Sequence, residues 1–284
     1  MYNLSRPCGL KDIPWIRSGR VSWSWWSDGG SPNDYNKLVP FVDLAATMGW
    51  EYSLIDLGWH DMRNGNIKQL INDAKSKGVG IILWYNSGRP HNHVDAWHVG
   101  IMDNPLKRKA EMKKLESWGV KGVKVDFMQS DKQYLMKLYE DILQDAAKHH
   151  LFVDFHGATI PRCWARTYPN LLTMEGIRGA EQYWDTNFAE NAHMFQTIYP
   201  FTRNVVGSMD YTPIAGLNGE VKTKTVSVPL SFLGEGNYEC LLITDGKVPR
   251  SFAGKTLKVG RDTVLSVNMA ERGGFTARIN LKKY

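Results

Sequence analysis

The chain has 284 residues, of which 43% are hydrophobic and 23% charged, the composition of an ordinary soluble globular protein with one or two domains. Its formal net charge of +6 is spread over scattered lysines and arginines, which is typical of solvated helix faces, so no nucleic-acid partner is expected. Three widely separated cysteines form neither a disulfide framework nor a metal motif, and no apolar run reaches membrane-spanning length. The N-terminus has no apolar signal core, so no signal peptide is expected in this chain.

After an irregular polar segment, residues 1–20, the chain alternates between strands and helices in the manner of βα units. Short apolar runs predict the strands, and apolar residues at helical spacing predict the helices. The predicted strands are Val21–Trp26, Tyr52–Leu57, Val79–Tyr85, Val123–Phe127, Leu151–Phe155, Leu171–Glu175 and Asn204–Met209. The predicted helices are residues 33–48, Ile67–Ser76, Pro105–Trp118, Lys132–His149 and Asn187–Ile198.

This order predicts an α/β fold with a (β/α)8-type barrel, and the barrel is incomplete because no seventh helix or eighth strand follows. The rest of the chain alternates with a period of two residues between turns rich in Gly, Asn and Asp, which indicates antiparallel strands. We therefore predict a barrel domain over residues 1–213 and a small C-terminal antiparallel β-sandwich or sheet domain over residues 214–284.

Asp126 is the carboxylate that ends the apolar run Gly122–Val125. A charged side chain is costly to bury unless it is paired with another group or takes part in function. Barrel enzymes place their catalytic groups at the carboxyl ends of their strands. Asp is also a favoured helix cap, so this stretch alone is equally compatible with an Asp that caps the following helix.

Polar or aromatic residues follow six of the predicted strands, and parallel strands bring such residues to one edge. They are Trp25 and Trp26, Asp56 and Trp59, Asn86, Asp126, His156, and Glu175. Cleavage of a glycosidic bond needs one carboxylate facing the anomeric carbon and a second that protonates the leaving oxygen, while aromatic faces hold the sugar. We predict that Asp126 attacks a sugar carbon and that the other polar and aromatic residues of this edge, including the substrate-binding candidates Trp26 and His156, serve that reaction.

The stretch Glu175–Glu181 places two acids six residues apart, with Arg178 between them. Carboxylate oxygens suit calcium, and two neighbouring carboxylates also raise each other's pKa, which suits a proton donor. A surface loop in which Arg178 pairs both acids explains the same pattern.

Together these segments resemble glycoside hydrolase family 97, a group of bacterial α-glucosidases and α-galactosidases. The resemblance covers about residues 10–213 and, more loosely, the C-terminal β part. Its motifs are Ser22–Trp26, Asp56–Trp59, Lys124–Phe127, Arg166–Asn170, Glu175–Glu181 and Ala215–Gly219.

The family divides by mechanism, and the resemblance implies the retaining, α-galactosidase-like branch. Retaining members have an Asp nucleophile where this chain has Asp126, whereas inverting members have Glu after the His that ends the fifth strand. Here His156 is followed by Gly157. The resemblance makes Glu181 the general acid/base in a two-step displacement that keeps the anomeric configuration.

The resemblance also implies a calcium ion bound by Glu175 and Glu181, a contact of Lys124 with a sugar hydroxyl, and a pocket that Asp56 and Trp59 line as well. It implies an α-galactoside or oligosaccharide substrate, a bacterial periplasmic location, and a chain that is a fragment without the family's N-terminal β-sandwich domain. It leaves the oligomeric state unknown. Two alternatives remain open: an α-glucosidase of the same family, and an inactive carbohydrate-binding remnant.

Overall fold

The computed structural model describes residues 5–97, 99–212, 223–248, 251–270 and 274–282. The chain forms two compact units, of which the first holds a six-stranded parallel sheet and the second holds small antiparallel sheets. This confirms the predicted fold class, an incomplete barrel followed by a small β part. The predicted boundary between residues 213 and 214 lies outside the described residues, as does the motif Ala215–Gly219.

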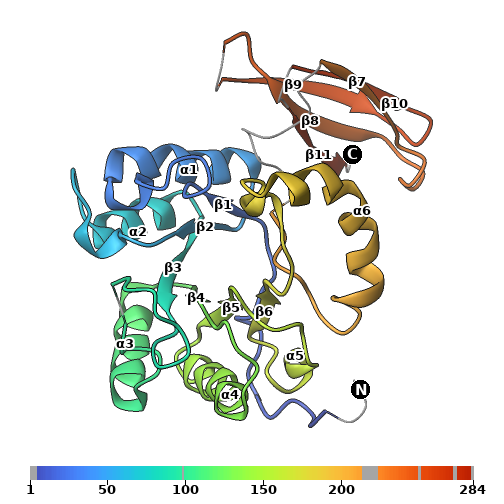
Figure 1. The fold of residues 1–284 in the computed structure, drawn as a ribbon. Coiled ribbons are helices and arrows are strands. Elements are labelled where there is room, and N and C mark those ends of the chain that lie inside the picture. Colours follow the sequence, from blue (N-terminus) through green and yellow to red (C-terminus); the bar gives the residue numbers. More distant parts are fainter. Residues whose placement is uncertain (1–4, 98, 213–222, 249–250, 271–273, 283–284) are drawn as a thin grey trace. The chain divides into compact units, whose positions relative to one another are not determined.

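The six parallel strands pair in the order of the sequence, β1-β2-β3-β4-β5-β6. In Figure 1 they curve around a common centre, with helices α1–α4 on the outer side. The strands are β1 (Val21–Trp23), β2 (Tyr52–Ile55), β3 (Gly80–Asn86), β4 (Gly122–Asp126), β5 (Phe152–Phe155) and β6 (Leu171–Met174). The helices are α1 (Tyr35–Met48), α2 (Ile67–Ser76), α3 (Pro105–Trp118), α4 (Gln133–Ala147), α5 (Trp164–Thr167) and α6 (Thr186–Thr202).

Side-chain caps explain where the outer helices begin. The side chain of Asp34 accepts a hydrogen bond from the backbone of α1, and Asn66 does the same for α2. Asn104 caps α3, whose first residue is Pro105, and left-handed Gly119 ends that helix. Each cap satisfies backbone groups that the helix itself leaves unpaired, so the helix ends are fixed by local sequence.

The core of the first unit lies between the sheet and its outer helices. Strands β2 to β5 are buried along almost their whole length, as expected for parallel strands covered on both faces. Gly122 is the first residue of β4. A Cβ at this position would lie 2.4 Å from the ring of Phe152. The close packing of β4 against β5 therefore requires a glycine at this position.

The predicted seventh strand, Asn204–Met209, is wrong. The segment forms turns, and its contact with the sheet is an isolated bridge between Met174 and Met209. Asn204, Gly207 and Ser208 favour turns over a pleated strand, which explains the outcome. The segment nevertheless reaches the end of β6.

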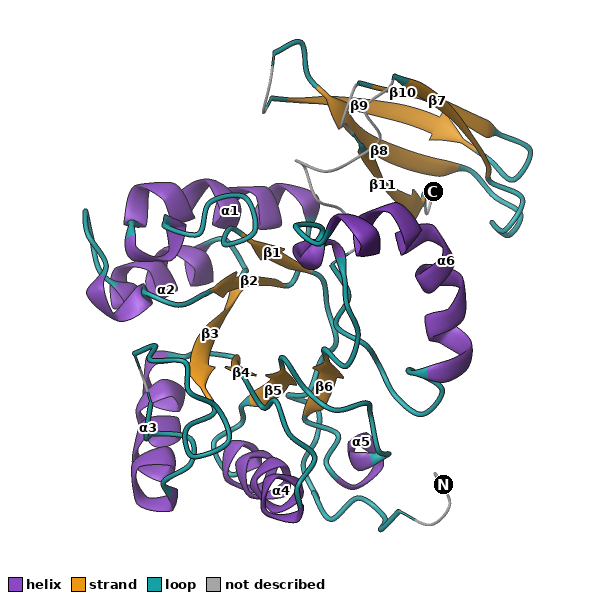
Figure 2. Cartoon of the chain, in the orientation of Figure 1, coloured by secondary structure: helices purple, strands orange, loops and turns teal. Residues whose placement is uncertain are grey.

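The second unit includes residues 180–189, where α6 begins, and its described residues from 223 onwards form strands as their regular elements, as Figure 2 shows. Strands β7 (Lys224–Pro229) and β10 (Val264–Met269) form an antiparallel pair. Strand β8 (Tyr238–Asp245) pairs with β9 (Phe252–Val259) and β11 (Phe275–Leu281). Alternate side chains bury a small core, which contains Leu230, Cys240, Leu242, Val259, Leu265 and Val267. Within the described part of the chain, every helix is too short or too polar to span a bilayer.

Low pH is expected to weaken the interaction between Arg20 and Glu51 next to the start of β1. The backbone N–H of Arg20 donates to Oε2 of Glu51 over 2.7 Å, and its guanidinium lies 2.8 Å from Oε1. These hydrogen bonds lower the pKa of Glu51 from 4.5 to about 2. Because the folded-state pKa lies below the unfolded one, the stabilisation is present above pH 4.5 and is lost as the pH falls towards 2.

Solvent screening limits this stabilisation to below about 1 kcal/mol. The free energy of unfolding of Glu51→Gln should lie below that of the wild type at pH 6, and the two should converge near pH 2, as measured by urea denaturation. The control Asp12→Asn changes an exposed acid. Its free energy of unfolding should equal that of the wild type at both pH values. A Glu51→Gln deficit that is independent of pH would contradict the linkage.

Candidate active site

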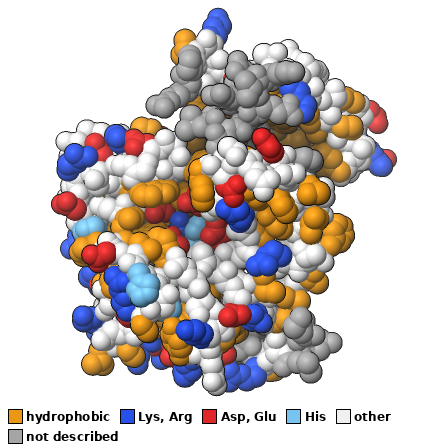
Figure 3. Space-filling model, viewed as in Figure 1, with side chains coloured by type: hydrophobic (Ala, Val, Ile, Leu, Met, Phe, Trp, Pro, Cys, Tyr) orange, Lys and Arg blue, Asp and Glu red, His pale blue; other side chains and the backbone are white. Residues whose placement is uncertain are grey.

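Polar side chains gather at the carboxyl edge of the parallel sheet. Asn86 and Asp126 are the last residues of β3 and β4, and Asp56, His156 and Glu175 directly follow β2, β5 and β6. Figure 3 shows acidic, basic and histidine side chains together in the middle of the curve. The structure thus places these predicted site residues at one edge of the sheet.

Asp126 is held in place by donors on two sides. The indole Nε1 of Trp84 donates to Oδ2 over 3.0 Å, and the backbone N–H of Phe127 donates to Oδ1 over 2.6 Å. The side chain is 14% exposed. Asp126 does not cap a helix, because α4 begins at Gln133 and its N-cap residue is Lys132. A nearly buried, oriented carboxylate remains at the end of β4.

Lys124 and Asp56 form a buried ion pair beside it. The Nζ atom of Lys124 lies 2.9 Å from Oδ2 of Asp56 and 4.4 Å from the ring centre of Trp23. Trp23 also donates from Nε1 to Oδ2 of Asp56 over 2.8 Å. Burial lowers the pKa of Lys124, but the charges of Asp56 and Asp126 outweigh it and raise the pKa above its ordinary value. Lys124 therefore stays an ammonium ion in the site.

His156 lies between three carboxylates. Its Nδ1 is 3.2 Å from Oε2 of Glu175 and 3.9 Å from Oδ1 of Asp126, and its Nε2 is 3.2 Å from Oδ2 of Asp210. Burial and Lys124 lower the pKa of His156, but the bond to Asp210 and the neighbouring acids raise it to about 10. The ring is therefore an imidazolium that donates from both nitrogens.

The sequence did not reveal two acids of this site, Asp154 and Asp210. Asp154 lies in β5, in register with Lys124 of β4 and Thr173 of β6. Burial and the charge of Asp210 raise the pKa of Asp154 well above its ordinary value. A lone Asp in the apolar run Phe152–Phe155 was a visible signal for Asp154, whereas only the tertiary fold brings Asp210 to His156.

The two predicted tryptophans differ in their surroundings. Trp59 is 3% exposed and donates from Nε1 to the backbone oxygen of Trp84 over 3.0 Å. Strand β1 ends three residues earlier than predicted, because the backbone N–H of Ser27 closes a turn onto the oxygen of Ser24. Trp26 therefore lies in a turn, partly buried.

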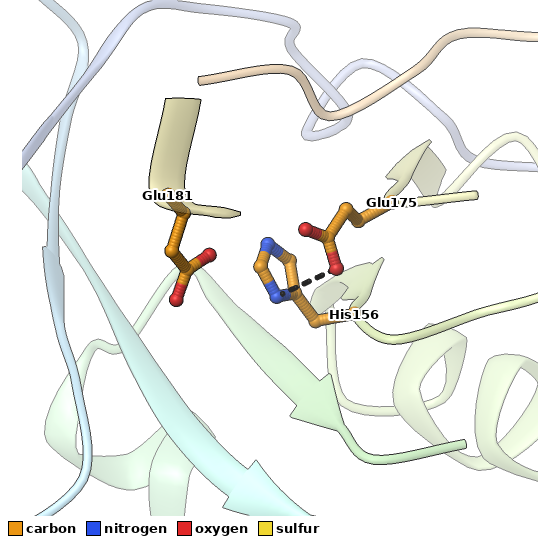
Figure 4. A group of neighbouring side chains, drawn as sticks. All are labelled: His156, Glu175 and Glu181. Atoms are coloured by element: carbon orange, nitrogen blue, oxygen red, sulfur yellow. Dashed lines mark ion pairs between the residues drawn. The ribbon is translucent and has the colours of Figure 1, made fainter. Parts of the chain in front are cut away.

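Glu175 and Glu181 belong to a group of neighbouring ligand atoms. Figure 4 shows the side chains of His156, Glu175 and Glu181. One ligand atom from each of these residues lies within 4.8 Å of the others. Glu175 also accepts from the backbone N–H of Gly157 over 2.9 Å, and burial raises its pKa. Carboxylate oxygens fit a hard cation such as calcium, whereas an imidazolium cannot ligate one. Glu175 and Glu181 are thus the chemically suited members.

The fold and this edge define a protein of the β/α barrel class with an acidic, histidine-containing site at the carboxyl ends of its strands. The profile of the family described as "Glycoside hydrolase 97" matches residues 15–177, which is more than half of the chain. The profile described as "Glycosyl-hydrolase 97 C-terminal, oligomerisation" matches residues 208–280. The chain belongs to glycoside hydrolase family 97.

Two relatives are similar over most of this chain. A protein of Streptomyces bingchenggensis named "Probable retaining alpha-galactosidase" is 39% identical over 72% of the chain. The "Retaining alpha-galactosidase" of Bacteroides thetaiotaomicron is 34% identical over 74%. The chain spans 31% and 32% of the length of these relatives.

Solved structures agree on the fold. A crystal structure of a beta-arabinopyranosidase superposes with a TM-score of 0.69 and 27% identity, covering 98% of this chain and 58% of that one. A family 97 enzyme of Pseudoalteromonas sp. strain K8, in complex with acarbose, gives a TM-score of 0.64 with 18% identity over 99% and 63% of the two chains.

Proposed function

We propose that this chain carries the catalytic site of a retaining glycoside hydrolase that cleaves terminal α-galactosides by double displacement. The observation that carries the proposal is the fixed carboxylate of Asp126 at the end of β4, between the cations Lys124 and His156. The names of the two relatives, retaining α-galactosidases, support the substrate class.

In the proposed first step, one oxygen of Asp126 attacks the anomeric carbon and forms a glycosyl ester, while Glu181 protonates the departing oxygen. In the second step Glu181 takes a proton from water, and the water releases the sugar with its configuration kept. The hydrogen bond from Trp84 fixes the attacking carboxylate, so little reorganisation is needed when the bond forms.

Gly157 supports the retaining mechanism. Its φ of +53° favours glycine, and a Cβ at this position would lie 3.5 Å from Oδ1 of Asp126. The residue after His156 thus offers no carboxylate to activate a water, whereas Asp126 stands beside it.

We propose that Lys124 and Asp56, together with His156, contact the hydroxyl groups of the sugar, and that Trp26 and Trp59 border the pocket. Glu175 and Glu181 would hold a calcium ion, whose chemistry is to offset their negative charge and fix their positions. We further propose a periplasmic location, a catalytic domain over residues 1–213, and a C-terminal domain over residues 214–284 that supports assembly of copies, as its family profile is described.

A β-L-arabinopyranoside is the second candidate substrate, because the structure with the TM-score of 0.69 is a beta-arabinopyranosidase. This sugar has the ring stereochemistry of an α-D-galactoside but lacks the hydroxymethyl group. The polar contacts proposed for Lys124 and Asp56 therefore suit both sugars.

The proposal is tested by following hydrolysis of three nitrophenyl glycosides, α-D-galactoside, β-L-arabinopyranoside and α-D-glucoside, by proton NMR. We expect the galactoside or arabinoside to be cleaved and the first product to have the anomeric configuration of its substrate. Activity should fall with a chelator and return with calcium. Cleavage of the glucoside alone identifies an α-glucosidase, an inverted first product excludes the double displacement, and binding without turnover identifies a carbohydrate-binding remnant.

A further inference from the structure

Two acids at the carboxyl edge of the sheet, Asp154 and Asp210, have no part in the proposed displacement. Asp154 is 8% exposed and lies in register with Lys124 of β4. Asp210 belongs to a segment that is fixed to the sheet, because its backbone N–H donates to the oxygen of Met174 over 2.9 Å. Neither carboxyl group attacks the sugar or protonates the leaving oxygen, so their presence here requires a separate explanation.

The surroundings of Asp154 disfavour a charged carboxylate. Its Oδ1 is buried, and no described residue donates a hydrogen bond to it. The ammonium group of Lys124, its neighbour in register, is bonded to Asp56 instead, over 2.9 Å. A buried charge is costly unless it is paired and hydrogen-bonded, whereas a neutral carboxylic acid avoids most of this cost. The position of Asp154 therefore favours the protonated form.

The side chains of Asp154 and Asp210 are hydrogen-bonded to each other. Two ionised carboxylates can only accept, so a hydrogen bond between them requires a proton on one of the two. Two carboxyl groups that share a site also repel each other when both are ionised, and such a pair holds one proton between them. The contact is therefore a carboxylic acid that donates to a carboxylate.

His156 determines which of the two carboxyl groups keeps the proton. Its Nε2 lies 3.2 Å from Oδ2 of Asp210 and donates to it, so Asp210 accepts as a carboxylate. Burial raises the pKa of Asp210, but the bond with His156 outweighs burial and lowers the pKa to about 2. Burial and the charge of Asp210 raise the pKa of Asp154 well above its ordinary value, although the cations His156 and Lys124 lower it. The proton thus belongs to Asp154.

We propose that Asp154 is a protonated positioning residue, whose hydroxyl donates to Asp210 and thereby fixes that carboxylate against Nε2 of His156. The side chain of Asp210 is 32% exposed, so without a second protein donor water would compete for its oxygens. With donors on two sides the carboxylate is held in place. The ring of His156 is then held with Nδ1 3.2 Å from Oε2 of Glu175 and 3.9 Å from Oδ1 of Asp126.

The arrangement acts on the proposed reaction through His156. A donor to Asp210 favours its ionised form, and the ionised form in turn favours the cation on His156. That cation lies beside the carboxylate of Asp126, which attacks the sugar in the proposed mechanism. The proton on Asp154 and its bond to Asp210 hold whether or not this site cleaves galactosides, and only their effect on turnover rests on the proposed function.

Infrared spectroscopy of the full chain tests for the proton, at about pH 8, where ordinary carboxyl groups are ionised. A carboxylic acid has a carbonyl stretching band that is separate from the bands of carboxylates and amides. We expect this band in the wild type and its loss in Asp154→Asn. The control Thr173→Val, which changes the neighbour in register on β6, should keep the band. If the difference between the wild type and Asp154→Asn contains no such band, Asp154 is ionised and the proposal is overturned.

The positioning is measured at the Nε2–H resonance of His156 in the full chain labelled with ¹⁵N-histidine. Asp154→Asn keeps a donor for Asp210, so the resonance should persist. Asp154→Leu is of similar size but has no donor, so the resonance should broaden by exchange with water, and kcat should fall at least about tenfold with KM little changed.

The variants Asp154→Asn and Asp154→Leu separate the possible outcomes. Equal loss of the resonance in both variants, or its persistence in both, overturns the role of the donor. Thermal melts establish whether Asp154→Leu folds; if it does not, loss of the resonance in Asp154→Asn overturns the role instead. A wild type that has the band and the resonance but cleaves no glycoside contradicts the proposed function alone.

Discussion

An Asp126→Asn variant is expected to cleave the nitrophenyl α-galactoside at least about 10⁴-fold more slowly than the wild type, a loss of roughly 5 kcal/mol of transition-state stabilisation. The amide cannot form the glycosyl ester, but it can still accept from Nε1 of Trp84, so the fold of the site should persist. The measurement is kcat/KM with matching circular dichroism spectra.

Rescue by small nucleophiles distinguishes the loss of the nucleophile from damage to the rest of the site. In Asp126→Gly, azide or formate should restore part of the turnover, because it occupies the space that the carboxylate leaves. The azide product should have the configuration opposite to that of the substrate, since only one displacement takes place. Asp131→Asn, an exposed acid of the same loop, should retain full activity. Near-normal turnover by Asp126→Asn would falsify the assignment of the nucleophile.

Local chemistry made much of the fold predictable. The bounds of α2 and α3 follow from the sequence because caps such as Asn104 and Gly119 fix the helix ends. The order of strands and helices places Asp126 and His156 at one edge without any knowledge of contacts. The strand predicted over Asn204–Met209 is wrong because the segment also contains turn-forming residues, which outweigh its few apolar ones.

The contacts between side chains within the site could not be predicted from the sequence. Trp23 lies on β1 and Lys124 on β4, three strands further along the sheet, and only the curl of the sheet brings the ring over the ammonium group. Asp210 comes from a segment without regular structure and reaches His156 because its backbone N–H bonds to Met174. Residue order gives the edge on which a side chain lies, whereas the curvature of the sheet decides which side chains meet.

Replacing Asp145 with Asn is expected to lower the free energy of unfolding of the first unit by about 3–5 kcal/mol. Arg108 of α3 donates to Oδ2 of Asp145 in α4 from Nε over 3.0 Å, with Nη2 at 2.9 Å. Both side chains are almost fully buried, so the variant leaves the charge of Arg108 uncompensated in the core. Urea denaturation followed by tryptophan fluorescence reports mainly the first unit, because ten of the eleven Trp residues lie in it and only Trp184 lies in the second.

The matched control is Lys148→Ala, which removes the exposed partner of the same carboxylate, 3.3 Å from Oδ1. It should cost less than about 1 kcal/mol, because water screens an exposed ion pair. The double variant Arg108→Met with Asp145→Leu should recover most of the lost stability, since it removes both buried charges together. Equal effects of Asp145→Asn and Lys148→Ala would show that burial does not set the strength of this pair. If the double variant is no more stable than Asp145→Asn, the loss comes from packing between α3 and α4 instead of from an unpaired charge.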